Sequence, residues 1–178
     1  VIEMGQLIAG PFASKLLGEF GADVIKIEPP RVGDPLRKWR KLKDGTSLWW
    51  HVQSRNKRSV TLDLKAAEGQ QIVRQLVAEA DILVENFRPG TMQRMGLDYE
   101  TLRQHNEGLI YASLSGFGSG KGADIGGYDL MVQAVGGLMS INGEKDHPVK
   151  VGVALVDVLT GLHMGMGILA ALHSRTSS

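Results

Sequence analysis

The chain has 178 residues, of which 43% are hydrophobic and 22% charged, and its formal net charge is +1 at pH 7. This composition is typical of a single globular domain, argues against an intrinsically disordered chain, and provides no global attraction to nucleic acid. No cysteine occurs, so disulfides and cysteine-ligated metals are excluded, and a reducing, cytoplasmic compartment is expected. The amino end shows no signal-peptide pattern.

Apolar and amphipathic segments alternate along the chain. We expect strands at residues 1–4, 22–27, 59–64, 81–84 and 109–114, and helices at 11–20, 66–80, 98–105 and 128–138. Residues 29–45 form a polar connection, and Ile72, Leu76 and Val77 share one face of the helix at 66–80. This alternation predicts an α/β fold with a mainly parallel sheet covered by helices.

One acid stands in an apolar run. Asp157 is the only acid between residues 151 and 172, and we expect a packed helix of about 16 residues after it, shorter than the ~20 needed to cross a bilayer. Gly161, Gly165 and Gly167 would let another backbone approach this helix closely. Because burying an unpaired carboxylate costs free energy, Asp157 is a candidate catalytic residue. Two other roles stay open, as the helix N-cap or as the partner of a buried arginine.

The ends of the chain suggest a longer protein. The first residue is Val within an apolar stretch, and only a few residues follow the apolar helix that would need cover on most sides. We therefore expect a fragment.

The region from 31 to 65 is basic, with ten Lys or Arg and three acids. It would form either a patch for a polyanionic small molecule or a solvated loop. The patch would comprise Arg37, Lys38, Arg40, Lys41, Lys43, Lys57, Arg58 and Lys65. Trp39, Trp49 and Trp50 lie in the same region and suit stacking on a base or packing of the loop.

The glycine-rich segment 116–122 (GFGSGKG) follows a predicted strand. It fits neither the GxGxxG spacing nor the P-loop, so we expect a flexible loop over a site rather than a phosphate cradle. The histidines show no metal-binding spacing, and no metal is expected.

Five segments, in order, resemble the class III CoA-transferase family (CaiB/BaiF type), which includes formyl-CoA transferases and is related to the α-methylacyl-CoA racemases. They are residues 9–30, 56–65, 80–96, 127–143 (GYDLMVQAVGGLMSING) and 151–161 (VGVALVDVLTG). The resemblance implies that residues 1–178 are the amino-terminal part of a Rossmann-like large domain that binds CoA. A smaller domain and the carboxyl-terminal part would be absent, and the full chain would form an interlocked homodimer.

The resemblance also implies the chemistry. Asp157 falls on the family's nucleophilic aspartate, which attacks a donor acyl-CoA and passes through mixed anhydrides and an aspartyl-CoA thioester before a carboxylic acid accepts the CoA. Tyr128 stands where the racemases carry a histidine. With an ordinary pKa near 10, a tyrosine suits hydrogen bonding to an acyl or anhydride oxygen better than proton shuttling. Racemisation, or a CoA-binding subunit without turnover, stays as an alternative, although neither His147 nor His163 matches the racemase segment.

The family's CoA contacts carry over to positions in four segments. They are Ile8, Ala9, Arg31, Leu62, Lys65, Asn86, Phe87, Arg88 and Arg94. Arg31 would replace a family arginine whose place is taken by Pro29 and Pro30. The implied partners are an acyl-CoA and a small carboxylic acid, with no permanently bound cofactor, no nucleic acid and no membrane.

Overall fold

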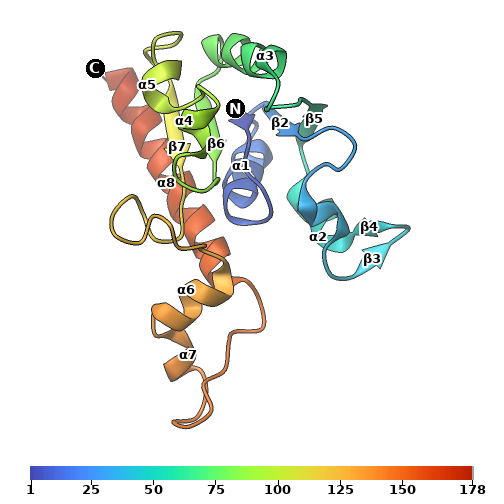
Figure 1. The fold of residues 1–178 in the computed structure, drawn as a ribbon, viewed down its shortest axis with the longest axis vertical. Coiled ribbons are helices and arrows are strands. Elements are labelled where there is room, and N and C mark those ends of the chain that lie inside the picture. The colour runs from blue at the N-terminus through green and yellow to red at the C-terminus, as the bar shows by residue number, and fades with distance from the viewer. Residues whose placement is uncertain (178) are drawn as a thin grey trace.

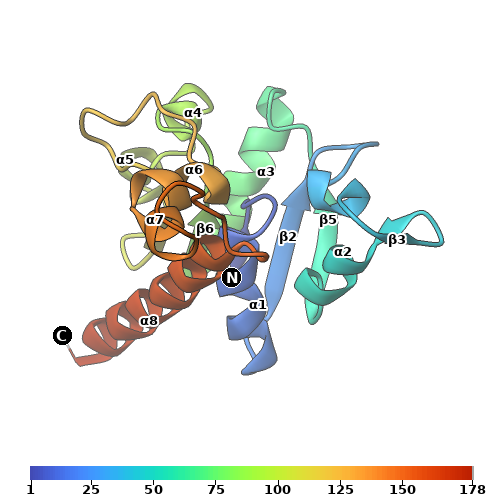
Figure 2. The same ribbon diagram turned by 90° about the horizontal axis from the view of Figure 1, so that it is seen from below.

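Five parallel strands form the central sheet of the computed structural model, which describes residues 1–177, with the strand order β5-β2-β1-β6-β7 (Figure 1). The strands are β1 (Ile2–Glu3), β2 (Val24–Glu28), β5 (Lys57–Thr61), β6 (Ile82–Glu85) and β7 (Ile110–Ser113). A separate antiparallel hairpin of β3 (Leu42–Lys43) and β4 (Thr46–Ser47) projects beyond the β5 edge (Figures 1 and 2). The predicted α/β class and parallel sheet are confirmed.

Each predicted helix is present, with shifted ends. The helices are α1 (Ala9–Glu19), α2 (Leu48–Gln53), α3 (Ala67–Ala78), α4 (Thr91–Arg94), α5 (Tyr99–Leu102), α6 (Asp129–Val135), α7 (Leu138–Ile141) and α8 (Leu155–Ser177), with a 3₁₀ turn at Pro35–Lys38. The helix predicted at 128–138 is interrupted, because Gly137 adopts a φ of +80° between α6 and α7. Helices α2 and α4 are present in addition to the predicted ones.

Helices cover both faces of the sheet, as the alternation along β6 shows. Leu83 of β6 packs with α3, whereas Ile82 and Val84 pack with Leu17 of α1 and Ile168 of α8. Successive side chains of a strand point to opposite faces, so α3 covers one face and α1 with α8 the other.

The buried face of α3 differs from the predicted one. Val73 and Val77 are fully buried in the core, but Ile72 is 40% exposed and Leu76 is half-buried. The prediction was therefore right for Val77 and wrong for Ile72, because the stripe that meets the sheet runs through Val73.

Helix α8 is longer than predicted and packs closely on α1. A Cβ atom at Gly161 would lie 2.7 Å from the carbonyl oxygen of Ala9, so only glycine permits this approach, as predicted. Gly165 and Gly167 have nothing within 4 Å of such an atom, so the prediction does not hold for them. Within the described residues, α8 is the one helix long and apolar enough to cross a membrane by length and composition alone.

The strand order reverses at β1. The chain passes from β1 to β2 and β5 on one side, then returns to place β6 and β7 on the other. In open parallel sheets, ligands bind outside the carboxyl ends of the strands at such a reversal. The fold therefore predicts a ligand site at the residues that follow β1 and β6.

Candidate active site

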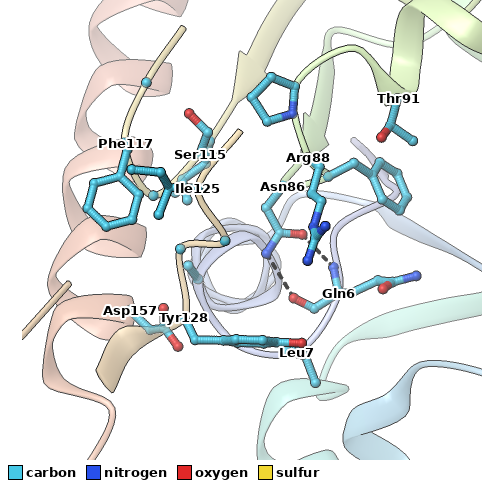
Figure 3. Close-up of a pocket in the computed structure, with 18 of the residues that line it drawn as sticks. Gln6, Leu7, Asn86, Arg88, Thr91, Ser115, Phe117, Ile125, Tyr128 and Asp157 are labelled. Carbon is cyan, nitrogen blue, oxygen red and sulfur yellow. Dashed lines mark hydrogen bonds between the residues drawn. The ribbon is translucent and has the colours of Figure 1, made fainter. Parts of the chain in front are cut away.

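A cavity of about 320 Å³ opens at the carboxyl ends of β1 and β6 (Figure 3). Its wall comes from the turn after β1, the segment after β6, the loop after β7 and the beginnings of α6 and α8. The polar side chains in this wall are those of Gln6, Asn86, Arg88, Thr91, Ser115, Tyr128 and Asp157. Asp157 and Tyr128, the two predicted catalytic residues, therefore meet in one cavity.

Asp157 lies in the first turn of α8, and another carboxylate caps this helix. The Oδ1 atom of Asp129 accepts hydrogen bonds from the backbone N–H groups of Val156 (2.8 Å) and Asp157 (3.2 Å). The proposed N-cap role of Asp157 is therefore wrong, because Asp129 performs it from the start of α6. The Asp157 side chain is left to face the cavity.

The environment of Asp157 favours its neutral form. Burial, and to a smaller degree the charge of Asp129, raises the pKa of Asp157 from an ordinary 3.8 to about 6. Among residues 1–177 no cation pairs with this carboxylate, so the alternative of a buried arginine partner finds no support in the described part of the chain. A half-buried carboxylate that is still mainly ionised at pH 7 is suited to act as a nucleophile or a base.

Tyr128 directly precedes α6 and is 62% exposed. Its side chain extends across the cavity toward Leu7, and Asp157 lies beside it (Figure 3). A ring that only packed the start of α6 would be buried, so this exposure leaves the phenol available to a ligand.

The turn after β1 is held from two sides. The side chain of Asn86 accepts a hydrogen bond from Gln6 N (2.7 Å) and donates one to Gln6 O (2.9 Å). The carboxylate of Asp34 accepts a hydrogen bond from Leu7 N (3.1 Å). Leu7 has a φ of +62°, a left-handed conformation that costs a non-glycine residue about 1–2 kcal/mol. These contacts fix an unfavourable turn at the cavity wall.

The predicted CoA-binding residues divide into two groups. Five line the cavity, namely Ile8, Ala9, Asn86, Phe87 and Arg88.

The other four predicted residues lie outside the cavity. Arg31 and Lys65 are exposed, and Leu62 packs against the core. Arg94 donates a hydrogen bond to Thr91 (3.0 Å), which is itself in the cavity wall. Arg31, Leu62 and Lys65 follow β2 and β5, whose carboxyl ends share the sheet edge with those of β1 and β6. An extended ligand at this edge could reach from one group to the other.

The basic region from 31 to 65 is not one continuous patch. The guanidinium of Arg37 pairs with Glu28 (2.7 Å) and stacks 3.7 Å above the Trp50 ring, and the Lys57 ammonium is buried against Glu3 (2.6 Å). These two cations therefore form ion pairs within the protein. Trp50 is buried and packs the connection, whereas Trp39 is 37% exposed.

The glycine-rich segment does lie over the site. Gly116, Phe117 and Gly118 line the cavity, together with residues 125–127. A Cβ atom at Gly116 would lie 2.3 Å from the Cα atom of Gly127, so two glycines are needed where this loop closes on itself. The predicted loop is present and borders the cavity, whereas its flexibility stays a prediction.

Two residues that position Asp157, Asp129 and Gln133, are not among the residues predicted from the sequence. Gln133 of α6 donates a hydrogen bond to Asp129 Oδ2 (2.6 Å) and accepts one from Val151 N (2.8 Å). Asp129 and Gln133 are four residues apart, so they share a face of α6 and together hold the segment that leads into α8. The available signal was an acid directly after Tyr128 with an amide one turn later.

Known proteins of one family are similar to this chain over nearly its whole length. The family model of CoA-transferase family III matches residues 1–178. The succinyl-CoA–D-citramalate CoA-transferase of Chloroflexus aurantiacus is 45% identical over 100% of this chain and 45% of its own length. The succinate–glutarate CoA-transferase of Agrobacterium fabrum is 46% identical over 97% of this chain and 45% of its own length.

A solved structure gives the same result. The crystal structure of a CAIB/BAIF family protein from Brucella suis superimposes with a TM-score of 0.93 at 43% identity, covering 99% of this chain and 48% of that one. The chain thus spans about half the length of the curated relatives that it matches.

Proposed function

The chain belongs to CoA-transferase family III, and from this premise we propose that the full protein moves CoA from an acyl-CoA donor to a carboxylic acid acceptor through Asp157. The observation that supports the proposal is the position of the Asp157 carboxylate. It faces the cavity at the carboxyl edge of the sheet, the edge at which open parallel sheets bind their ligands.

The proposed reaction uses the carboxylate twice as a carrier. One Asp157 oxygen attacks the donor carbonyl, which forms a mixed anhydride and releases the CoA thiolate. The thiolate then attacks the Asp157 carbonyl, which forms an aspartyl-CoA thioester and releases the donor acid as its carboxylate. An acceptor carboxylate reverses both steps, so acyl-CoA leaves, Asp157 returns to its carboxylate and no proton is consumed.

The cavity suits this chemistry in two respects. The first turn of α1 has no side-chain cap, so its amide N–H groups beside Ile8 and Ala9 give the cavity wall a positive partial charge. Such a charge stabilises an oxygen that becomes negative in the transition state. The Tyr128 phenol can donate a hydrogen bond to a second oxygen of the acyl group.

The geometry favours transfer over racemisation. A racemase needs a second proton-transfer group across the substrate from Asp157. No histidine lines the described cavity, and His163, on α8, is exposed with its ring nitrogen 2.8 Å from Leu159 O. His147 is exposed as well.

The test is transfer by the full-length protein and its Asp157→Asn variant. Succinyl-CoA is the first donor to use, since one relative is named for that donor and another for transfer involving succinate, with a panel of carboxylic acids as acceptors. We expect turnover in the wild type, loss of more than about 10³-fold in the variant, and a hydroxamate at Asp157 after addition of hydroxylamine. Near-normal turnover in the variant would refute the proposal, and hydrogen exchange at the α-carbon in deuterated water without transfer would favour the racemase.

The assembly and location of the protein follow from the same proposal. We propose a homodimer of interlocked full-length chains in the cytoplasm, with this segment as the amino-terminal part of the large CoA-binding domain. Arg31, Leu62, Lys65 and Arg94 would then contact the nucleotide part of CoA, beyond the cavity that holds the acyl end.

A further inference from the structure

Four charged side chains form a buried quartet against the turn after β1, namely Glu3, Lys26, Asp34 and Lys57. Lys26 Nζ lies 2.7 Å from Glu3 Oε1 and 2.9 Å from Asp34 Oδ2, and Lys57 Nζ lies 2.6 Å from Glu3 Oε2. Each of the four side chains is at most 2% exposed. They come from β1, β2, the connection after β2 and β5, so the quartet joins distant parts of the chain.

The quartet is balanced, with two acids and two bases. Burial alone would raise the pKa of Glu3, but the adjacent Lys26 and Lys57 outweigh it and lower that pKa. Burial likewise opposes the charge on Lys26, yet Glu3 and Asp34 raise its pKa. Buried ion pairs give little net stability compared with well-packed apolar side chains, so four such residues call for another explanation.

Three members of the quartet also hold the backbone from the turn after β1 into the first turn of α1. Lys26 donates a hydrogen bond to Gly5 O (2.8 Å) and Lys57 donates one to Pro11 O (2.7 Å). Asp34 accepts from Leu7 N (3.1 Å) and, through the same oxygen, from Leu36 N (2.8 Å). The segment fixed in this way, residues 5–11, contains the left-handed Leu7 and the cavity-lining Ile8 and Ala9.

We propose that this quartet is a positioning device, which acts through Asp34 to hold the strained Leu7 turn and thereby the start of α1 at the cavity wall. The inference rests on the proposed function, because the wall serves the acyl group that reacts with Asp157. A strained turn persists only when its surroundings over-determine it, and the quartet contacts Leu7 N directly and the backbone on either side of it at Gly5 O and Pro11 O. None of the four charges needs to touch the substrate.

The test compares two variants of the full-length protein. Asp34→Asn keeps an oxygen near Leu7 N and Leu36 N but removes the charge that faces Lys26. Val73→Ala is the control, because Val73 is fully buried on α3, lines no part of the cavity, and its truncation lowers stability without touching the turn.

The Leu7 turn should respond to loss of the Asp34 charge and not to a general loss of stability. For Asp34→Asn we expect kcat to fall at least about 10-fold while KM for the acyl-CoA changes less than about 3-fold. Amide hydrogen exchange in peptides covering residues 5–11 should rise by at least about 10-fold. Val73→Ala should keep kcat within about twofold of the wild type and leave exchange in that segment unchanged.

A double variant tests the same contact without leaving a buried charge unpaired. Lys26→Met with Asp34→Leu replaces the ion pair by apolar side chains and leaves Leu7 N without its acceptor, so it should also lose kcat if it folds. Unchanged kcat and unchanged exchange in Asp34→Asn would overturn the inference even if Asp157→Asn is inactive. If the wild type itself transfers no CoA, the proposed function fails, and the exchange measurement alone still decides whether the quartet holds the turn.

Discussion

Removing the proposed nucleophile should stabilise the protein. In the folded chain the pKa of Asp157 is raised from 3.8 to about 6 by burial and by Asp129, so ionised Asp157 opposes folding. A carboxyl with a raised pKa in the folded state destabilises the protein at pH values above that pKa. This penalty decreases as the pH falls below about 6 and is lost below about 3.8, where both states are protonated.

The size of the effect follows from the shift. A change from 3.8 to about 6 corresponds to about 3 kcal/mol at ~1.4 kcal/mol per unit. Since the carboxylate faces a cavity that water can enter, screening reduces the expected gain to about 1–2 kcal/mol. Asp157→Asn mimics the neutral acid in shape, so the variant should be more stable than the wild type by this amount at pH 8.

Urea unfolding of the full-length protein at two pH values measures the gain. The free energy of unfolding should favour Asp157→Asn at pH 8 and should be equal for both proteins below pH 3.8, which serves as the internal control. A variant that is less stable than the wild type at pH 8 would refute the reasoning, because it would mean that the charge is compensated in the folded protein. Stability gained with activity lost is the pattern expected of a functional carboxylate.

Two further predictions concern the position and the ionisation of Asp157. Gly161→Ala would place a Cβ atom 2.7 Å from Ala9 O, whereas the Cβ atom of the control variant Gly167→Ala would meet nothing within 4 Å. Gly161→Ala should therefore lower the free energy of unfolding by about 1–3 kcal/mol relative to Gly167→Ala, and it should lower kcat by about 10-fold. Equal stability and activity in the two variants would contradict the α1–α8 contact. The value of kcat/KM should fall as the pH drops below about 6, since protonation removes the nucleophile. The Asp129→Asn variant should move the midpoint of this pH profile to lower pH. An unmoved midpoint would show that the Asp129 charge does not act on Asp157.

Much of the fold was readable because strands of a parallel sheet are apolar on both faces. Ile82, Leu83 and Val84 illustrate this, since each packs into one of the two layers. The face of α3 was harder to predict. Ile72 and Val73 are neighbours with similar side chains, and only the position of the sheet decides which of them is buried.

For the candidate site as well, some residues could be predicted from the sequence and others could not. Asp157 stood out because it interrupts an apolar run, and Tyr128 was found through the resemblance. The cap of α8 could not be read from the sequence, since Asp129 reaches Val156 N from 27 residues away. The same holds for Asp34, whose contact with Leu7 also spans 27 residues. Long-range hydrogen bonds of this kind leave no local pattern.

The order of the cavity segments along the chain has a consequence for synthesis. A ribosome that has released the chain up to α4 has already supplied β1, β2, β5 and β6, and with them the turn after β1 and the segment Asn86–Arg88. Tyr128, Asp129 and Asp157 emerge later. A nascent chain therefore exposes the residues of the cavity floor before Asp157, the proposed nucleophile, has been synthesised.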